Sequence, residues 1–192
     1  MNKCAGCDLC CRKYRIYLFP SEAKKISRHL KINFRDFVEK YLDLYFEIFT
    51  VPKGTECTEF LRLPETFGKN KVLFISLAIK QKDSACVFLE KTQCRIYDYR
   101  PTICKLFPYL KLAGESYDFC KLDSELKEDE IIHAREKYYP ILRKYLSDLN
   151  SKGIRNTWKY LPKFTTDNIV LIEDGKNRDV NKDLLCFIAQ DI

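Results

Sequence analysis

A chain of 192 residues, 46% of them hydrophobic, is long and apolar enough to form one domain with its own core. Its longest uncharged apolar run, Val72 to Ile79, has eight residues, against the roughly 20 that a membrane-spanning helix needs. We therefore expect no membrane segment. Because the first cysteine stands at position 4, no room is left for an apolar secretion leader, and we expect a cytoplasmic protein.

The formal net charge of +7 counts every thiol as neutral. If eight thiolates bound two divalent centres, eight negative and four positive charges would together lower it to +3. Basic residues accompany the cysteines, since Arg12, Lys13 and Arg15 follow one group and Arg100 and Lys105 lie within another. We therefore interpret much of the positive charge as an offset to thiolates. Nucleic acid is possible as a partner but is not favoured.

The first predicted elements are a strand and two helices. Residues 15–19 alternate in polarity and predict a strand. Ser21 marks the start of a helix that is expected to end near His29, and Asn33 is placed to cap a second helix. The apolar side of this second helix is expected to comprise Phe34, Phe37, Val38, Tyr41, Leu42 and Tyr45.

From about residue 46 the pattern changes to strands separated by proline and glycine. The candidate strands are residues 48–51, 59–63, 72–77 and 85–89. Gly114 indicates a hairpin, and residues 123–150 predict a helix that Pro140 kinks or splits. The buried stripe of this helix is expected to comprise Ile131, Ala134, Tyr138, Ile141, Leu142, Tyr145 and Leu149.

The last third adds a strand at residues 169–172 and a turn at Asp174 and Gly175. We find no internal repeat. These elements predict an α+β fold, with a small, irregular, cysteine-rich core centred on metal, short antiparallel strands and flanking helices. We expect a cysteine-rich metal-binding domain at residues 1–121, with a helical C-terminal region at 122–192 packed on it as one compact unit.

The strongest functional signal is the segment CAGCDLCC, which contains Cys4, Cys7, Cys10 and Cys11. Two C-x-x-C steps share the middle cysteine, and a two-residue gap lets the chain turn so that both thiolates face one ion. Clustered exposed thiols without a role would be prone to oxidation. We therefore predict that all four are metal ligands. The side chains of adjacent residues diverge, so Cys10 and Cys11 are expected to bind different metal sites or opposite edges of one metal site.

A second cysteine set is expected to complete the metal sites. It comprises Cys86, Cys94, Cys104 and Cys120, which are separated by seven, nine and fifteen residues. Spacing alone is weak here, because a free cysteine also packs as a small apolar residue. Arg100 stands among these cysteines and is predicted to contact a thiolate or the edge of a cluster.

The remaining candidate ligands are few. His29 and His133 are the only histidines and are expected to lie on the surface, while Cys57 and Cys186 are expected to pack in the core. An all-thiolate site favours zinc or iron–sulfur over catalytic zinc, which usually has histidine or carboxylate ligands. Because C-x-x-C steps followed by an adjacent cysteine are typical of cluster-binding runs, we favour a 4Fe-4S cluster and keep zinc as the alternative.

CAGCDLCC followed by C-x7-C-R-I-Y-D-Y-R-P-T-I-C-K-L-F-P resembles the CxxCxxxCC family of zinc- or iron-chelating proteins. The downstream family motif falls on Cys86, Cys94, Ile96, Tyr97, Arg100, Pro101, Cys104, Lys105 and Phe107, with Cys120 where a last family cysteine is expected. The resemblance covers residues 4–120 and implies metal chelation. Flagellin lysine methylases have a similar cysteine pattern, which implies a possible enzyme.

Three functions follow from these signals, and the sequence leaves open whether the chain is an enzyme. The first is a metal-binding protein, possibly redox-active, that holds an iron–sulfur cluster or zinc. The second is a metal-dependent modifying enzyme such as a protein lysine N-methyltransferase. The third is a zinc-stabilised nucleic-acid-binding module. A protein or small-molecule partner is expected, but the sequence does not identify it.

Overall fold

The computed structural model describes residues 7–55, 61–106 and 166–191, together with residues 133, 136, 140, 141 and 144. Contacts divide the chain into two compact units, each built from two stretches of sequence. Unit 1 comprises Met1–Leu18 and Ile79–Leu146, and unit 2 comprises Phe19–Ala78 and Ser147–Ile192. The predicted domain boundary at residue 121 falls outside the described residues and stays a prediction.

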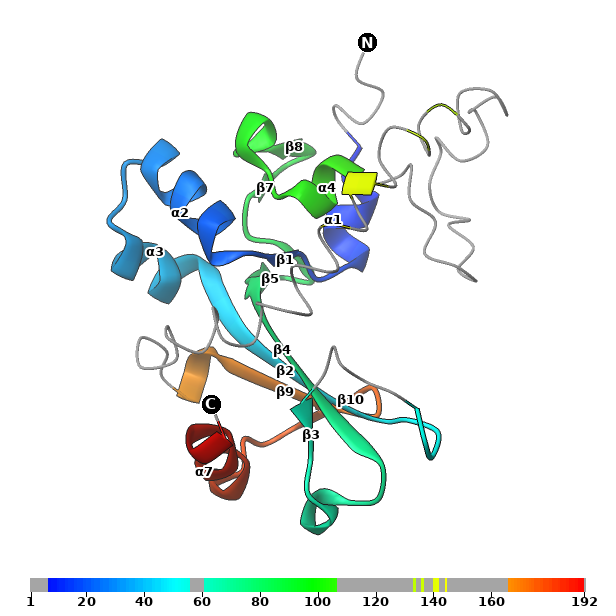
Figure 1. The fold of residues 1–192 in the computed structure, drawn as a ribbon. Coiled ribbons are helices and arrows are strands. Elements are labelled where there is room, and N and C mark those ends of the chain that lie inside the picture. The colour runs from blue at the N-terminus through cyan, green and yellow to red at the C-terminus, as the bar shows by residue number, and fades with distance from the viewer. Residues whose placement is uncertain are drawn as a thin grey trace. The chain divides into compact units, whose positions relative to one another are not determined.

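The protein is α+β, as predicted, with short helices around mixed sheets. Figure 1 shows the elements in chain order from blue to red. Within the described part of the chain, no helix combines the length and the apolar character that crossing a bilayer requires.

Unit 2 is built on a sheet in which β4 (Lys71–Ile79), β2 (Leu42–Thr50), β9 (Ile169–Glu173) and β10 (Lys176–Arg178) are neighbours in that order. Figure 1 shows β4, β2 and β9 side by side. Strand β2 pairs with β9 in parallel, whereas β10 and the short β3 (Leu61–Arg62) pair antiparallel with β9 and β4. The strand at 169–172 and the turn at Asp174 and Gly175 are thereby confirmed.

The helices α2 (Pro20–His29) and α3 (Phe34–Tyr41) confirm the two predicted N-terminal helices. The N-cap of α2 is Phe19, whose backbone N–H donates to Glu22 Oε2 at 2.9 Å, and Pro20 occupies the first helical position. The N-cap of α3 is Asn33, as predicted, and its Oδ1 accepts the Asp36 backbone N–H at 3.0 Å.

The predicted extent of α3 is wrong at its C-terminal end. Leu42 and Tyr45 were expected on its apolar face, but both belong to β2. The apolar residues Leu42, Leu44, Phe46 and Ile48 alternate with others at period two and are buried. Because this alternation places all four on one face of a strand, it overrides the helical spacing that begins in α3. The sheet therefore begins before residue 46.

The core of unit 2 is apolar and densely filled. Phe37, Phe46, Leu73 and Leu77 have almost no exposed surface. The C-terminal helix α7 (Lys182–Asp191) buries Leu184 and Ile188, and its Phe187 ring stands 5.8 Å from that of Phe67 in the 3-10 turn η1 (Glu65–Phe67). A second 3-10 turn, η5 (Thr166–Asn168), precedes β9.

Unit 1 consists of much shorter elements. They are α1 (Leu9–Lys13), β1 (Tyr17–Leu18), β5 (Gln81–Lys82), β6 (Ala85–Cys86), β7 (Leu89–Glu90), β8 (Gln93–Cys94), the 3-10 turn η2 (Tyr97–Tyr99) and α4 (Thr102–Leu106). The predicted strand at 15–19 is confirmed in β1. The hairpin at Gly114 lies outside the described residues, and so does most of the helix at 123–150. The described Ile141 is exposed, so its predicted place in a buried stripe is wrong.

Candidate metal centre

Two successive hairpins of the same construction present Cys86 and Cys94. Gln81 pairs with Cys86 across β5 and β6, and Leu89 pairs with Cys94 across β7 and β8. In both hairpins a turn of two residues connects the strands, and the cysteine is the second residue after the turn. Residues 80–87 and 88–95 therefore repeat one structural unit. The prediction of a single strand at 85–89 is wrong, because β6 and β7 belong to different hairpins.

The turns of these hairpins explain why the sequence did not reveal them. Two-residue hairpin turns need a positive φ and usually contain glycine or asparagine. Here Asp83, Ser84 and Lys91 adopt φ values of 51°, 59° and 57°. None of these residue types is a strong hairpin signal. The recurring signal was the cysteine itself, two residues after each turn.

The residue that follows each of these eight-residue units supplies a backbone donor to the cysteine of that unit. The Phe88 backbone N–H donates to the Cys86 sulfur, and the Ile96 N–H donates to the Cys94 sulfur. Phe88 and Ile96 are fully buried, which anchors both donors. Burial raises the pKa of Cys86 to about 11, and the N–H bond opposes this shift because it stabilises the thiolate. Burial likewise raises the pKa of Cys94, and the Ile96 N–H bond opposes this shift.

Two short helices bring further cysteines to these hairpins. Cys10 lies in α1, which packs against β6. An ion pair of 2.8 Å between Arg12 Nε and Asp8 Oδ2 spans one turn of this helix. Cys104 lies in α4, where its backbone N–H donates to the Pro101 carbonyl at 3.0 Å.

The electrostatics show that four of these thiols are neighbours. The pKa of Cys104 is raised well above its usual value, first by burial and then by the negative charge of Cys86, Cys10 and Cys94. Cys10 also raises the pKa of Cys86 and of Cys94. These mutual effects require short separations. The fold thus brings Cys10, Cys86, Cys94 and Cys104 together from α1, both hairpins and α4.

The other predicted ligands divide into two groups. Cys7 and Cys11 are half-buried, and a side-chain hydrogen bond with Cys11 is the largest cause of the raised pKa of Cys10. Cys4 and Cys120 lie outside the described residues. Among the residues described, no group of three His, Cys, Asp or Glu side chains is already arranged to hold a metal ion. The four neighbouring thiols therefore need local adjustment before they can coordinate an ion together.

The expectations for the remaining candidates have mixed outcomes. His29 and His133 are exposed, as predicted. Cys186 is exposed on α7, so the prediction that it packs in the core is wrong. The apolar face of α7 falls on the neighbouring positions Leu184 and Ile188. Cys57 lies outside the described residues.

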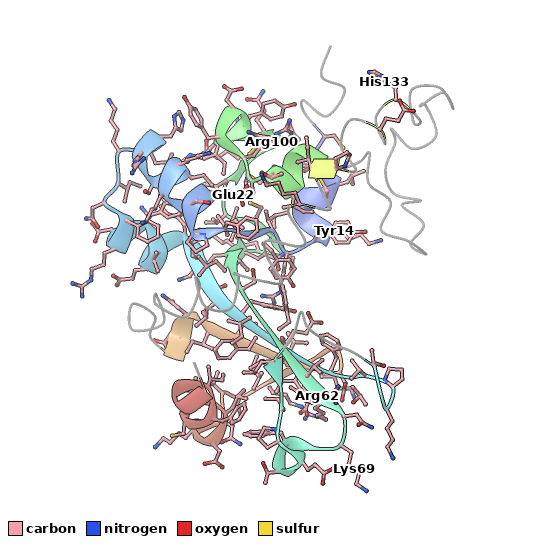
Figure 2. All side chains as sticks on the ribbon, in the orientation of Figure 1. Tyr14, Glu22, Arg62, Lys69, Arg100 and His133 are labelled. Atoms are coloured by element: carbon pink, nitrogen blue, oxygen red, sulfur yellow. The ribbon has the colours of Figure 1, made fainter. Side chains whose placement is uncertain are left out.

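Arg100, which Figure 2 labels, lies directly after η2. Its positive charge lowers the pKa of both Cys94 and Cys104, against the larger effect of burial. Its guanidinium carbon stands 3.9 Å from the centre of the Tyr97 ring. The sequence analysis identified Arg100 but did not identify Tyr97 as the ring on which it stacks. The two residues stand three positions apart, in the pattern Y-x-x-R, and this spacing could have indicated the contact.

The donor set fits a thiophilic metal. Four neighbouring thiols suit zinc or an iron–sulfur cluster better than a hard cation. Their raised pKa values follow partly from mutual repulsion, which a bound cation removes. Two backbone N–H groups already point to sulfur, as expected for thiolates that are to carry negative charge.

Comparison with known proteins agrees with this chemistry. The family CxxCxxCC, described as "Putative zinc- or iron-chelating domain", matches residues 3–136. No curated protein and no solved structure matches the chain. Because the match spans more than half of the sequence, the chain belongs to this family of zinc- or iron-chelating domains.

Proposed function

We propose that the chain is an iron–sulfur protein in which Cys10, Cys86, Cys94 and Cys104 bind one cluster. The convergence of these four thiols from distant segments is the observation that carries the proposal. Such a centre, when bound, would accept and return single electrons. The protein residues hold the cluster, shield it by burial and donate backbone N–H bonds to its cysteines. Zinc bound by the same thiols is the alternative.

The choice of iron–sulfur over zinc is supported by the N-terminal cysteine run. Repeated C-x-x-C steps with an adjacent cysteine are typical of cluster-binding segments, where neighbouring cysteines serve different centres. Of the adjacent pair, Cys10 interacts with the downstream thiols, whereas Cys11 interacts with Cys10. Cys4, Cys7, Cys11 and Cys120 are proposed as ligands of a second centre.

The test is metal and sulfide analysis, with an absorption spectrum, on protein purified without air. We expect iron and inorganic sulfide near four per cluster and broad visible charge-transfer bands. Cys94→Ser is expected to lose the iron of the cluster that Cys94 binds. Cys186→Ser is the matched control, because this exposed cysteine lies in unit 2 and is expected to leave the iron content unchanged.

Two results would contradict the proposal in different ways. A colourless protein with zinc and no sulfide would replace the cluster with a structural zinc site. Unchanged metal content in both Cys94→Ser and Cys104→Ser would show that the ligands are wrong. The lysine methyltransferase and nucleic-acid functions stay predictions. A partner for the centre, whether a cosubstrate, a redox partner or another protein, stays a prediction as well.

A further inference from the structure

Arg100 has a buried Nε atom with no hydrogen-bond partner among the described residues. We infer that Arg100 is a positioning residue of the metal centre and that its Nε–H donates a hydrogen bond to a metal-bound sulfur. The inference rests on the proposed metal site and adds the residue that tunes it. A buried donor left without a partner destabilises the protein, and a charged donor does so more strongly, so an acceptor is expected.

The surrounding chain holds the guanidinium in a fixed place. Arg100 stacks on the Tyr97 ring at 3.9 Å, a cation–π geometry that fixes the plane of the guanidinium. The turn η2 is closed by a bond of 2.9 Å from the Tyr99 N–H to the Ile96 carbonyl. Pro101, which follows directly, is buried and accepts two N–H groups from the first turn of α4. Arg100 is thus fixed from both sides.

The thiols of the candidate centre are the groups whose charge Arg100 is shown to affect. Arg100 interacts electrostatically with Cys94 and Cys104, which precede and follow it in the chain. A protonated thiol is a weak acceptor, whereas a thiolate or sulfide held by a metal carries negative charge and accepts well. Binding of the metal therefore creates the partner that the Nε atom needs.

A second arginine shows what is particular to Arg100. Arg95 lies on the neighbouring hairpin, where its Nε stands 3.1 Å from Glu90 Oε1 and its side chain is 41% exposed. Its charge is satisfied by a carboxylate at the surface. Arg100 instead has a buried Nε donor without a hydrogen-bond partner among the described residues, and its charge acts on Cys104. Arg95 is therefore the matched control, because its substitution also removes one positive charge from this part of the chain but removes no proposed hydrogen bond to the centre.

The hydrogen bond has a chemical consequence that can be measured. A donor on a cluster sulfur stabilises the reduced state, which carries more negative charge, and so raises the reduction potential. On zinc-bound thiolates the same bond lowers the nucleophilicity of the sulfur. Both effects disappear when the donor is removed, whichever metal is bound.

The experiment compares the intact chain with Arg100→Met, Arg100→Lys and Arg95→Met after each has been analysed for iron and zinc. We expect Arg100→Met to keep its metal and to shift the equilibrium between reduced and oxidised cluster about tenfold toward oxidised, or 59 mV for one electron. Arg100→Lys keeps the charge but lacks Nε and is expected to shift it in the same direction by less. Arg95→Met is expected to match the wild type.

Other outcomes decide against the inference or against its premise. Equal reduction potentials in the wild type and in metal-loaded Arg100→Met would overturn the inference. If Arg100→Met loses its metal, Arg100→Lys takes its place, and an unchanged reduction potential in Arg100→Lys would overturn the inference. If the centre holds zinc, the measured quantity is the rate at which iodoacetamide alkylates its thiolates, in place of the reduction potential. We expect this rate to rise roughly tenfold in Arg100→Met. Wild-type protein without iron or zinc would instead contradict the proposed function itself.

An anion from solution is the competing partner for the Nε atom. Inorganic phosphate can be titrated into wild-type protein and Arg100→Met by calorimetry. Heat from the wild type alone, with equal potentials in both proteins, would assign the atom to an anion site and overturn the inference. No heat in either, together with the shifted potential, is the result that we expect.

Discussion

The two units of this protein are stabilised in different ways. Unit 2 contains two strands of nine residues and buries large apolar side chains such as Phe46 and Leu73. Every described strand of unit 1 has two residues, and among its described residues few large apolar side chains are buried, Phe88 and Ile96 among them. Strands this short are not stable by themselves. We therefore predict that metal–thiolate bonds contribute to the stability of unit 1 what apolar burial contributes in unit 2.

The largest effect is expected on removal of the metal. Because structural metal contributes about 10–16 kcal/mol in small zinc-binding peptides, a chelator should abolish amide protection in both hairpins and leave β2 and β4 protected. Hydrogen exchange resolved by residue or peptide measures this. Equal loss of protection in both units would break the comparison.

The second effect is the pH dependence of metal binding. With the pKa of Cys86 near 11 and those of Cys94 and Cys104 also raised, the thiols are protonated at neutral pH. Binding must displace these protons, so affinity falls as pH falls, by up to about four log units per pH unit for four thiols. Titration with Co²⁺ between pH 6 and 8, followed by absorption, measures the slope. A slope near zero would show that thiols are not the ligands.

A third effect concerns unit 2 alone. Phe46→Ala removes a fully buried ring and is expected to cost about 3–5 kcal/mol of unfolding free energy, without change in metal content. Phe49→Ala on the same strand is the control, since this ring is half-buried and should cost less. Urea unfolding followed by far-ultraviolet circular dichroism measures the stability of both variants, and metal analysis measures their metal content. Loss of metal in Phe46→Ala would mean that the two units are energetically coupled.

The smallest effect is in the hairpin turns. Ser84 has a φ of 59°, which glycine adopts without strain. Ser84→Gly is therefore expected to stabilise metal-loaded unit 1 by about 0.5–1 kcal/mol. Lys82→Gly, in the adjacent strand β5, should destabilise it by a similar amount. The measurement is the rate at which each variant loses metal to a chelator. A change of this rate in the same direction in both variants would contradict the turn assignment.

Much of unit 2 was predictable because its signals are local. The Asn33 cap, the apolar run of β4 and the turn at Asp174 and Gly175 each depend on a few adjacent residues. The junction between α3 and β2 was not predictable, because Leu42 satisfies a helical and a strand pattern at once. Only pairing of β2 with β9 decides between them. The hairpins of unit 1 were missed since their turns contain residues that seldom adopt positive φ.

At the candidate metal centre, the sequence by itself was enough to predict thiol ligands. Cysteine spacing is a local property, so it pointed to the cysteines and to Arg100, and the two histidines were expected on the surface, where the structure places them. Only the tertiary structure decided that Cys10 interacts with the downstream thiols, and that Arg100 Nε is buried without a hydrogen-bond partner among the described residues. The physical reason is that such contacts depend on how α1, the hairpins and α4 pack, and packing between distant segments leaves no local pattern in the chain.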